Sequence, residues 1–196
     1  MLDSGARGFV QPVVERAARL FHSHGVSPNA VTGMAFVTGL LTTAAYAAGR
    51  SFFALGLLWI SGFLDVTDGT LARISGRVSP LGTLFDLLGD RVVEAVFIVA
   101  TALVFPESRL ACVLLLASII FSFSIFLIVG MLSEKAEKSG KSFYYQAGLA
   151  ERTETFIIFS LVILWPEHVE SLFYVFTAII VFTGCQRFHE AYRYLK

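Results

Sequence analysis

The sequence predicts an all-α membrane protein with six transmembrane helices, preceded by an N-terminal amphipathic helix at the membrane interface. Hydrophobic residues make up 56% of the 196 residues and charged residues only 15%, whereas soluble domains carry about a quarter charged residues. The apolar residues also form runs near the length of a membrane span, about 20 residues at a rise of about 1.5 Å each. The net charge of zero argues against a nucleic-acid partner, because no basic excess remains to neutralise phosphates.

The expected spans are bounded by charged residues and turn signals. The first follows the helix-start sequence Ser27-Pro28-Asn29 and ends before Gly49-Arg50. The polar segment 133–145 is expected to be a connection between the fourth and fifth runs. We therefore expect one membrane domain over residues 1–196, with a six-helix transmembrane bundle at 28–192. Its six runs are 30–48, 52–71, 81–104, 110–132, 155–165 and 169–184.

The N-terminal segment 1–25 is expected to lie on the membrane rather than cross it. Its apolar residues recur at helical spacing on the side opposite Glu15, Arg16 and Arg19, as in helices that bind the membrane surface. These apolar residues are Phe9, Val10, Val13, Ala17, Leu20 and Phe21.

Basic residues predict the orientation of the spans. Of the 15 Lys and Arg residues, Arg50 and Arg109 fall on one side, Arg91 lies inside a span, and all the others share the opposite side. Lys and Arg prefer the cytoplasmic flanks of membrane spans. Both termini are therefore expected in the cytoplasm, which an even number of spans also requires.

Four aspartates interrupt the second and third runs. Asp65 and Asp68 are three residues apart, and Asp86 and Asp90 are four apart, so each pair lies on one helix face. An ionised Asp at mid-span costs about 2.5–3.5 kcal/mol. Like charges this close require compensating cations. Oxygen ligands suit Mg²⁺ or Mn²⁺, and the sequence predicts a metal site between two antiparallel helices.

Small residues and one arginine accompany the aspartates. Gly69, Ala72 and Gly82 would allow a ligand to approach the backbone closely. Arg73 adds a fixed cation suited to a phosphate oxygen. Metal ions, a guanidinium and glycine-lined space together indicate a diphosphate site, which we expect at the cytoplasmic end of the spans.

These residues form a pattern that resembles the signature of the CDP-alcohol phosphotransferase family at all of its defining positions. The stretch from Asp65 to Arg73 reads DVTDGTLAR, and Gly82, Asp86 and Asp90 follow at the family's spacing. The six-span layout, the preceding surface helix and the sequence Pro28-Asn29-x-x-Thr32 extend the resemblance over essentially the whole chain.

The resemblance implies a reaction and roles for the residues. A phosphatidyl-type group would pass from a CDP-linked lipid, CDP-diacylglycerol or an archaeal analogue, to the hydroxyl of a small polar alcohol, releasing CMP. Asp65, Asp68, Asp86 and Asp90 would hold two Mg²⁺ or Mn²⁺ ions, and Asp90 would also act as the base. Family members usually form homodimers. The residues implied to contact the nucleotide or its diphosphate are Asn29, Thr32, Asp65, Asp68, Gly69, Ala72, Arg73 and Gly82.

The sequence gives fewer signals for the acceptor alcohol than for the donor. Asp90 is followed by Arg91, which resembles the inositol-phosphate branch of the family more than the glycerol-phosphate and serine branches. Lys135, Arg152 and Arg187 could bind an acceptor phosphate, or Arg152 and Arg187 could simply anchor span ends. For Glu94, pairing with Arg91 or a neighbouring helix is favoured over a catalytic role.

Other functions remain as alternatives. A phosphatidylserine-synthase-type acceptor would keep the same chemistry. A cation transporter could use the intramembrane carboxylates without any nucleotide. An aspartate-rich prenyltransferase would need two separate acidic clusters on more helices than this chain offers.

Overall fold

The described part of the chain consists of helices and their connections. The structure, a computed structural model, describes residues 2–138 and 152–195, and the side chains of 10–132 and 153–193. Short 3₁₀ helices, η1 (Pro106–Ser108) and η2 (Pro166–His168), precede α5 and α7. The α-helices are α1 (Leu2–Ser23), α2 (Pro28–Ala47), α3 (Ser51–Ile74), α4 (Pro80–Val104), α5 (Arg109–Lys138), α6 (Arg152–Leu164) and α7 (Val169–Leu195).

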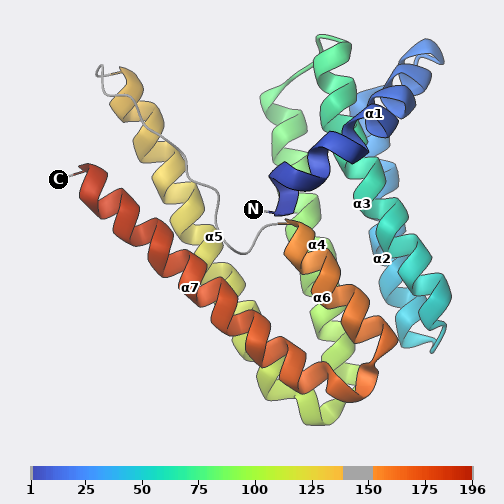
Figure 1. Cartoon of the computed structure of the whole chain (residues 1–196), viewed down its shortest axis with the longest axis vertical. Coiled ribbons are helices and arrows are strands. Elements are labelled where there is room, and N and C mark those ends of the chain that lie inside the picture. Colours follow the sequence, from blue (N-terminus) through green and yellow to red (C-terminus); the bar gives the residue numbers. More distant parts are fainter. Residues whose placement is uncertain (1, 139–151, 196) are drawn as a thin grey trace.

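The helices fall into two groups that meet at one end (Figure 1). The helices α1, α2, α3, α4 and α6 form one group, and α5 packs along α7 in the other. Consecutive long helices run in opposite directions, so the starts of α2 and α4 lie at the same end as the end of α3. The α5–α7 pair diverges from the first group toward that end.

The main hydrophobic core lies where the two groups meet. It contains Phe97 of α4, Leu115 of α5, Phe159 of α6 and Phe173 of α7, each at most 3% exposed. Ring stacking adds order there, since the centroids of Phe97 and Phe159 are 4.4 Å apart. A smaller cluster joins α1 to α2 and α3. The main core fills the end of the molecule where the two groups meet. The opposite end, which we call the open end, is therefore left for polar residues.

Two Ser-Pro sequences start the helices that frame this polar end. Ser27 Oγ accepts a hydrogen bond from Ala30 N at 3.2 Å, and Ser79 Oγ accepts one from Gly82 N at 3.1 Å. The proline that follows each serine occupies the first helical turn, where a missing N–H costs nothing. These caps fix where α2 and α4 begin.

A glycine follows each of the helices α2 and α3 and ends it. Gly49 follows α2 and Gly76 follows α3, with φ angles of 71° and 66°. This left-handed conformation suits glycine, which terminates helices for that reason. The short turn at Gly76 reverses the chain, and α4 then packs against α2, which also packs against α3.

The expected helices are present, but some boundaries differ. The segment 133–138, predicted as part of a polar connection, continues α5 to Lys138, because its sequence SEKAEK consists mostly of good helix formers. The last helix likewise extends beyond the predicted residue 184 to Leu195. A polar segment need not end a helix when its residues have high helix propensity.

Four helical segments among the described residues are long and apolar enough to cross a membrane: Pro28–Ala47, Ser51–Ile74, Pro106–Leu132 and Pro166–Arg193. The helix α4 has 25 residues but carries Asp86, Asp90, Arg91 and Glu94. The apolar part of α6 is shorter than a usual span. The protein is a multi-pass membrane protein, while the count of six spans stays a prediction.

Candidate active site

Three of the four predicted aspartates form one cluster at the open end. Asp65 and Asp68 come from the last three turns of α3, and Asp86 comes from the second turn of α4. One carboxylate oxygen of each lies within 4.8 Å of the other two. The turn at 75–79 returns the chain so that the two helices present these oxygens to one another. The predicted meeting of the aspartate pairs from two helices is therefore present for these three.

The cluster suits a divalent cation. Asp68 is only 5% exposed, and Asp86 Oδ1 is buried without a hydrogen-bond partner among the described residues. Buried carboxylate oxygens are costly unless a proton donor or a cation satisfies them. A set of carboxylate oxygens is the donor chemistry of Mg²⁺ and Mn²⁺. The residues present therefore fit the predicted metal ions.

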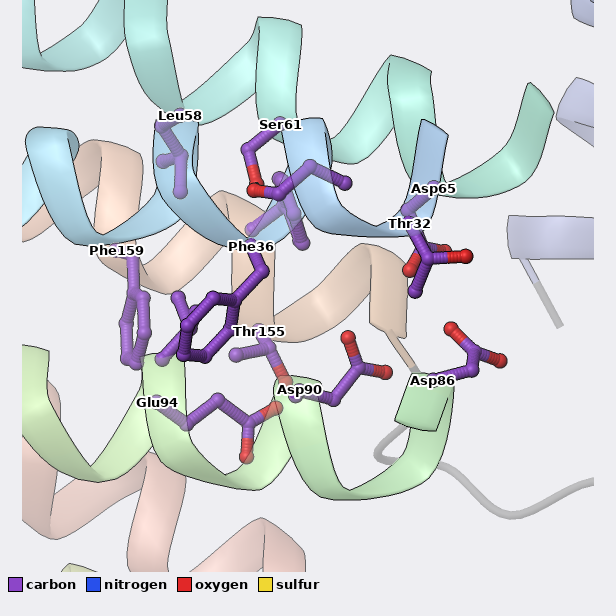
Figure 2. Close-up of a pocket in the computed structure, with 14 residues that line it drawn as sticks. Thr32, Phe36, Leu58, Ser61, Asp65, Asp86, Asp90, Glu94, Thr155 and Phe159 are labelled. Carbon is purple, nitrogen blue, oxygen red and sulfur yellow. The ribbon is translucent and has the colours of Figure 1, made fainter. Parts of the chain in front are cut away.

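A cavity of about 50 Å³ adjoins the cluster. Figure 2 shows the carboxylates of Asp65, Asp86 and Asp90 directed into the same space from α3 and α4. Asp90 lies one turn beyond Asp86 on α4 and is outside the cluster of three. Its position beside the cluster, rather than within it, is appropriate for a group that accepts a proton. We call this space the catalytic cavity.

Two helix starts lie beside each other near the cluster. A Cβ atom placed on Gly82 would lie 3.3 Å from Asn29 Oδ1 and 3.1 Å from Ser79 Oγ, so the beginnings of α2 and α4 are close. Helix N-termini favour negatively charged ligands. Two of the predicted nucleotide contacts, Asn29 and Gly82, are therefore in a suitable place for a diphosphate.

The other predicted nucleotide contacts lie on α3 and α2. Arg73 Nη2 donates a hydrogen bond to Thr70 Oγ1 at 3.0 Å, and its Nη1 lies 3.7 Å from the position of a Cβ atom on Gly69. The hydrogen bond thus holds the exposed guanidinium of Arg73 near Gly69. Thr32 lines the catalytic cavity. Ala72 is partly buried on α3.

The predicted acceptor residues are described only in part. Arg187 lines a second cavity of about 200 Å³ bounded by α4, α5, α6 and α7. The side chains of Lys135 and Arg152 lie outside the described residues. The predicted pairing of Glu94 with Arg91 is confirmed, since Arg91 Nη2 donates to Glu94 Oε1 at 2.9 Å.

Some residues around the catalytic cavity were not identified from sequence. Thr155 of α6, Phe36 of α2 and Ser61 of α3 all line it. Ser61 Oγ donates to the carbonyl oxygen of Ala35 at 2.8 Å, which ties α3 to α2. The available signal was a hydroxyl residue within or beside an apolar run for Ser61 and Thr155, and one hydrophobic residue among many for Phe36. Neither signal shows which helices meet.

Relatives cover the whole chain. The "Inner membrane protein YnjF" of Escherichia coli K12 is 30% identical, over all of this chain and 98% of that protein. The "Archaetidylinositol phosphate synthase" of Pyrococcus horikoshii is 29% identical, over 98% of each chain. These two relatives match the full length of the fold rather than the aspartate motif alone.

Solved structures share the fold. The phosphatidylinositol phosphate synthase PgsA1 of Mycobacterium tuberculosis, in complex with manganese and citrate, superposes with a TM-score of 0.71 at 21% identity, covering 91% of this chain and 88% of that one. The same enzyme with CDP-DAG bound gives a TM-score of 0.66 at 20% identity, covering 92% and 94%. The family profile for CDP-alcohol phosphatidyltransferase matches residues 25–185, a range that holds the aspartate cluster and every residue that lines the catalytic cavity. This chain belongs to the CDP-alcohol phosphatidyltransferase family, and it is a transferase.

Proposed function

We propose that the protein transfers a phosphatidyl-type group from a CDP-linked lipid to a hydroxyl of a phosphorylated alcohol, with release of CMP. The observation that carries this proposal is the cluster of Asp65, Asp68 and Asp86 beside Asp90. The acceptor that we favour is inositol phosphate, ahead of glycerol phosphate. Relatives named archaetidylinositol phosphate synthase and the Asp90-Arg91 sequence support this choice.

The aspartates account for metal binding. Asp65, Asp68 and Asp86, with help from Asp90, would hold two Mg²⁺ or Mn²⁺ ions, and the related PgsA1 was solved with manganese. Such ions neutralise a diphosphate and make its phosphorus more electrophilic. The protein's part is to hold these carboxylates together at the polar end of α3 and α4, where they would otherwise repel one another.

Asp90 performs the proton transfer in this proposal. Its carboxylate accepts the proton of the attacking hydroxyl as the oxygen forms a bond to the β-phosphorus of the donor. The bond from that phosphorus to the oxygen of CMP breaks, and CMP leaves with the electron pair. Asp90 has the position for this step because it lines the cavity that Asp65 and Asp86 also line.

The remaining predicted residues would bind the diphosphate and nucleotide of the donor and the phosphate of the acceptor. Asn29 and Gly82, at the starts of α2 and α4, would face the donor's diphosphate with Thr32, Gly69, Ala72 and Arg73 along its nucleotide. The related PgsA1 was solved with CDP-DAG bound. Arg187 would contact the acceptor phosphate, together with Lys135 and Arg152, whose side chains lie outside the described residues.

The proposed arrangement in the membrane follows from the same fold. Residues 28–192 would form six spans in one domain, and α1 would lie at the interface with Val10, Val13 and Leu20 toward lipid, since these side chains are 45–60% exposed. Both termini and the aspartate cluster would face the cytoplasm, from the distribution of Lys and Arg. CMP could then leave into water while the acyl chains stay in lipid. We also propose a homodimer.

The proposal is tested by measuring CMP release from CDP-diacylglycerol with myo-inositol 1-phosphate as acceptor. An Asp90→Asn variant should lose about 10²- to 10⁴-fold in rate, the usual contribution of a positioned base. A Glu107→Gln variant removes a carboxylate from an exposed position in η1 and should be as active as the wild type. Full activity of Asp90→Asn would contradict the assigned base, and ion flux without CMP release would favour a transporter.

A further inference from the structure

The second cavity shares a wall with the catalytic cavity. Glu94 of α4 and Thr155 of α6 line both cavities, and both are labelled around the catalytic cavity in Figure 2. The second cavity is the larger of these two, about 200 Å³ against about 50 Å³. A small polar molecule in the second cavity would therefore meet Glu94 and Thr155 on its way to Asp90.

Two arginines line the second cavity and are held by aromatic rings of α5. The Cζ atom of Arg91 lies 5.3 Å from the centroid of the Phe123 ring, and that of Arg187 lies 5.8 Å from the Phe126 ring. The two phenylalanine rings stack at 6.0 Å. Cation–π contacts of this kind hold a guanidinium in place. The arginines thus come from α4 and α7 but share one aromatic support.

Both arginines retain capacity to donate hydrogen bonds. The Nε atoms of Arg91 and Arg187 are buried and have no hydrogen-bond partner among the described residues. Arg91 is also committed to Glu94, since its Nη2 donates to Glu94 Oε1 at 2.9 Å, and the Glu94 side chain is only 13% exposed. Arg91 therefore fixes the direction of the Glu94 carboxylate as well as contributing positive charge.

This distribution of charge gives an acceptor a defined orientation. A phosphate group is attracted by the guanidiniums and repelled by a carboxylate. An ionised carboxylate only accepts hydrogen bonds, and the partner that suits it is a hydroxyl group. A phosphorylated polyol would thus place its phosphate toward the arginines and its hydroxyls toward Glu94, at the wall next to Asp90.

We propose that Glu94 determines acceptor specificity by accepting hydrogen bonds from the ring hydroxyls of inositol phosphate, and that Arg91 is the positioning residue that holds its carboxylate in place. This inference rests on the proposed function. Glycerol 3-phosphate, after one hydroxyl reacts, has a single further hydroxyl to offer. It should therefore gain much less from Glu94 than inositol phosphate does.

Steady-state kinetics of CMP release with each acceptor test the inference. Glu94→Ala should raise the KM for myo-inositol 1-phosphate by about 10- to 100-fold, the loss expected for hydrogen bonds to a charged group. The KM for glycerol 3-phosphate should change less than about threefold, and that for CDP-diacylglycerol should not change. Arg91→Gln should shift the same preference in the same direction, with a smaller effect.

Two control variants and one binding measurement complete the test. Glu170→Gln and Arg50→Gln remove the same kinds of charge at exposed positions that line neither cavity, and both should behave as wild type. Myo-inositol 1-phosphate should raise the thermal unfolding temperature of the Mn²⁺-loaded wild type, and this rise should be smaller in the milder variant Glu94→Gln.

The outcomes separate this inference from the proposed function. Equal changes in the KM for both acceptors, or lower thermal stability with every KM unchanged, would show that the Arg91–Glu94 pair is only structural. Absence of CMP release by the wild type with either acceptor would instead refute the proposed function, and the acceptor role of Glu94 with it.

Discussion

Replacing Asp86 by Asn should stabilise the metal-free protein and abolish its stabilisation by metal. In the cluster, oxygens of Asp65, Asp68 and Asp86 lie within 4.8 Å of one another. Two unit charges at that separation repel by about 3.5 kcal/mol at an effective dielectric constant of about 20. The substitution keeps the shape of the side chain and removes two of the three repulsive pairs, about 7 kcal/mol before relaxation.

Relaxation reduces this figure, because Asp65 and Asp86 are only partly buried and can turn toward water. We expect a net gain of about 1–3 kcal/mol, which corresponds to a rise in Tm of about 2–12 °C for a chain of this size. Bound metal has a larger effect on the wild type than on the variant. A cation at about 100 times its Kd stabilises the wild type by about 2.7 kcal/mol, and the variant should lose most of this effect.

The assay is thermal unfolding of the purified protein in detergent, with EDTA or with Mn²⁺. Glu107→Gln, at an exposed position of η1, serves as the control for loss of one negative charge and should follow the wild type in both conditions. If Asp86→Asn is no more stable than the wild type in EDTA and still gains as much from Mn²⁺, the three carboxylates do not hold a cation together, and the reasoning is refuted.

Three further substitutions test the geometry around the site. Gly82→Ala places a Cβ atom 3.1 Å from Ser79 Oγ and 3.3 Å from Asn29 Oδ1. It should cost about 1–3 kcal/mol in donor binding, read as a KM for CDP-diacylglycerol raised about 5- to 100-fold. Gly130→Ala, with open space around it, should not change that KM. Gly62→Ala would force α3 against the Phe156 ring of α6 and should lower the free energy of unfolding by about 1–3 kcal/mol. Gly56→Ala, in open space on the same helix, should raise the free energy of unfolding by about 0.5–1 kcal/mol. Equal stability of the two variants would argue against the contact of residue 62 with Phe156. Arg73→Gln should weaken donor binding without changing the KM for the acceptor, because the guanidinium lies beside Gly69 and Thr70 rather than in the second cavity; an effect confined to the acceptor would contradict that placement.

Local patterns in the sequence were sufficient to predict the helices and the meeting of the aspartates. The Ser-Pro starts of α2 and α4 and the glycines after α2 and α3 are local signals, and they fix the short turn that brings Asp86 to Asp65 and Asp68. The Arg91–Glu94 pair was also predictable, because residues three apart share a helix face.

The second cavity was not predictable in this way. It depends on where α5 and α7 pack relative to α4 and α6, and these helices pack through the core that contains Phe97, Leu115, Phe159 and Phe173. Thr155 follows Asp90 by 65 residues in the chain, and no local spacing relates the two. Residues that line a cavity from several helices become evident only when the helices are assembled.

The most direct test of the proposed function is metal-dependent release of CMP from CDP-diacylglycerol by the purified protein. With Mn²⁺ and myo-inositol 1-phosphate, the wild type should release CMP and form the corresponding lipid product, and EDTA or the Asp65→Ala substitution should abolish both. Release of CMP that continues undiminished in Asp65→Ala, or in EDTA, would contradict the assignment of the aspartate cluster as the catalytic metal site.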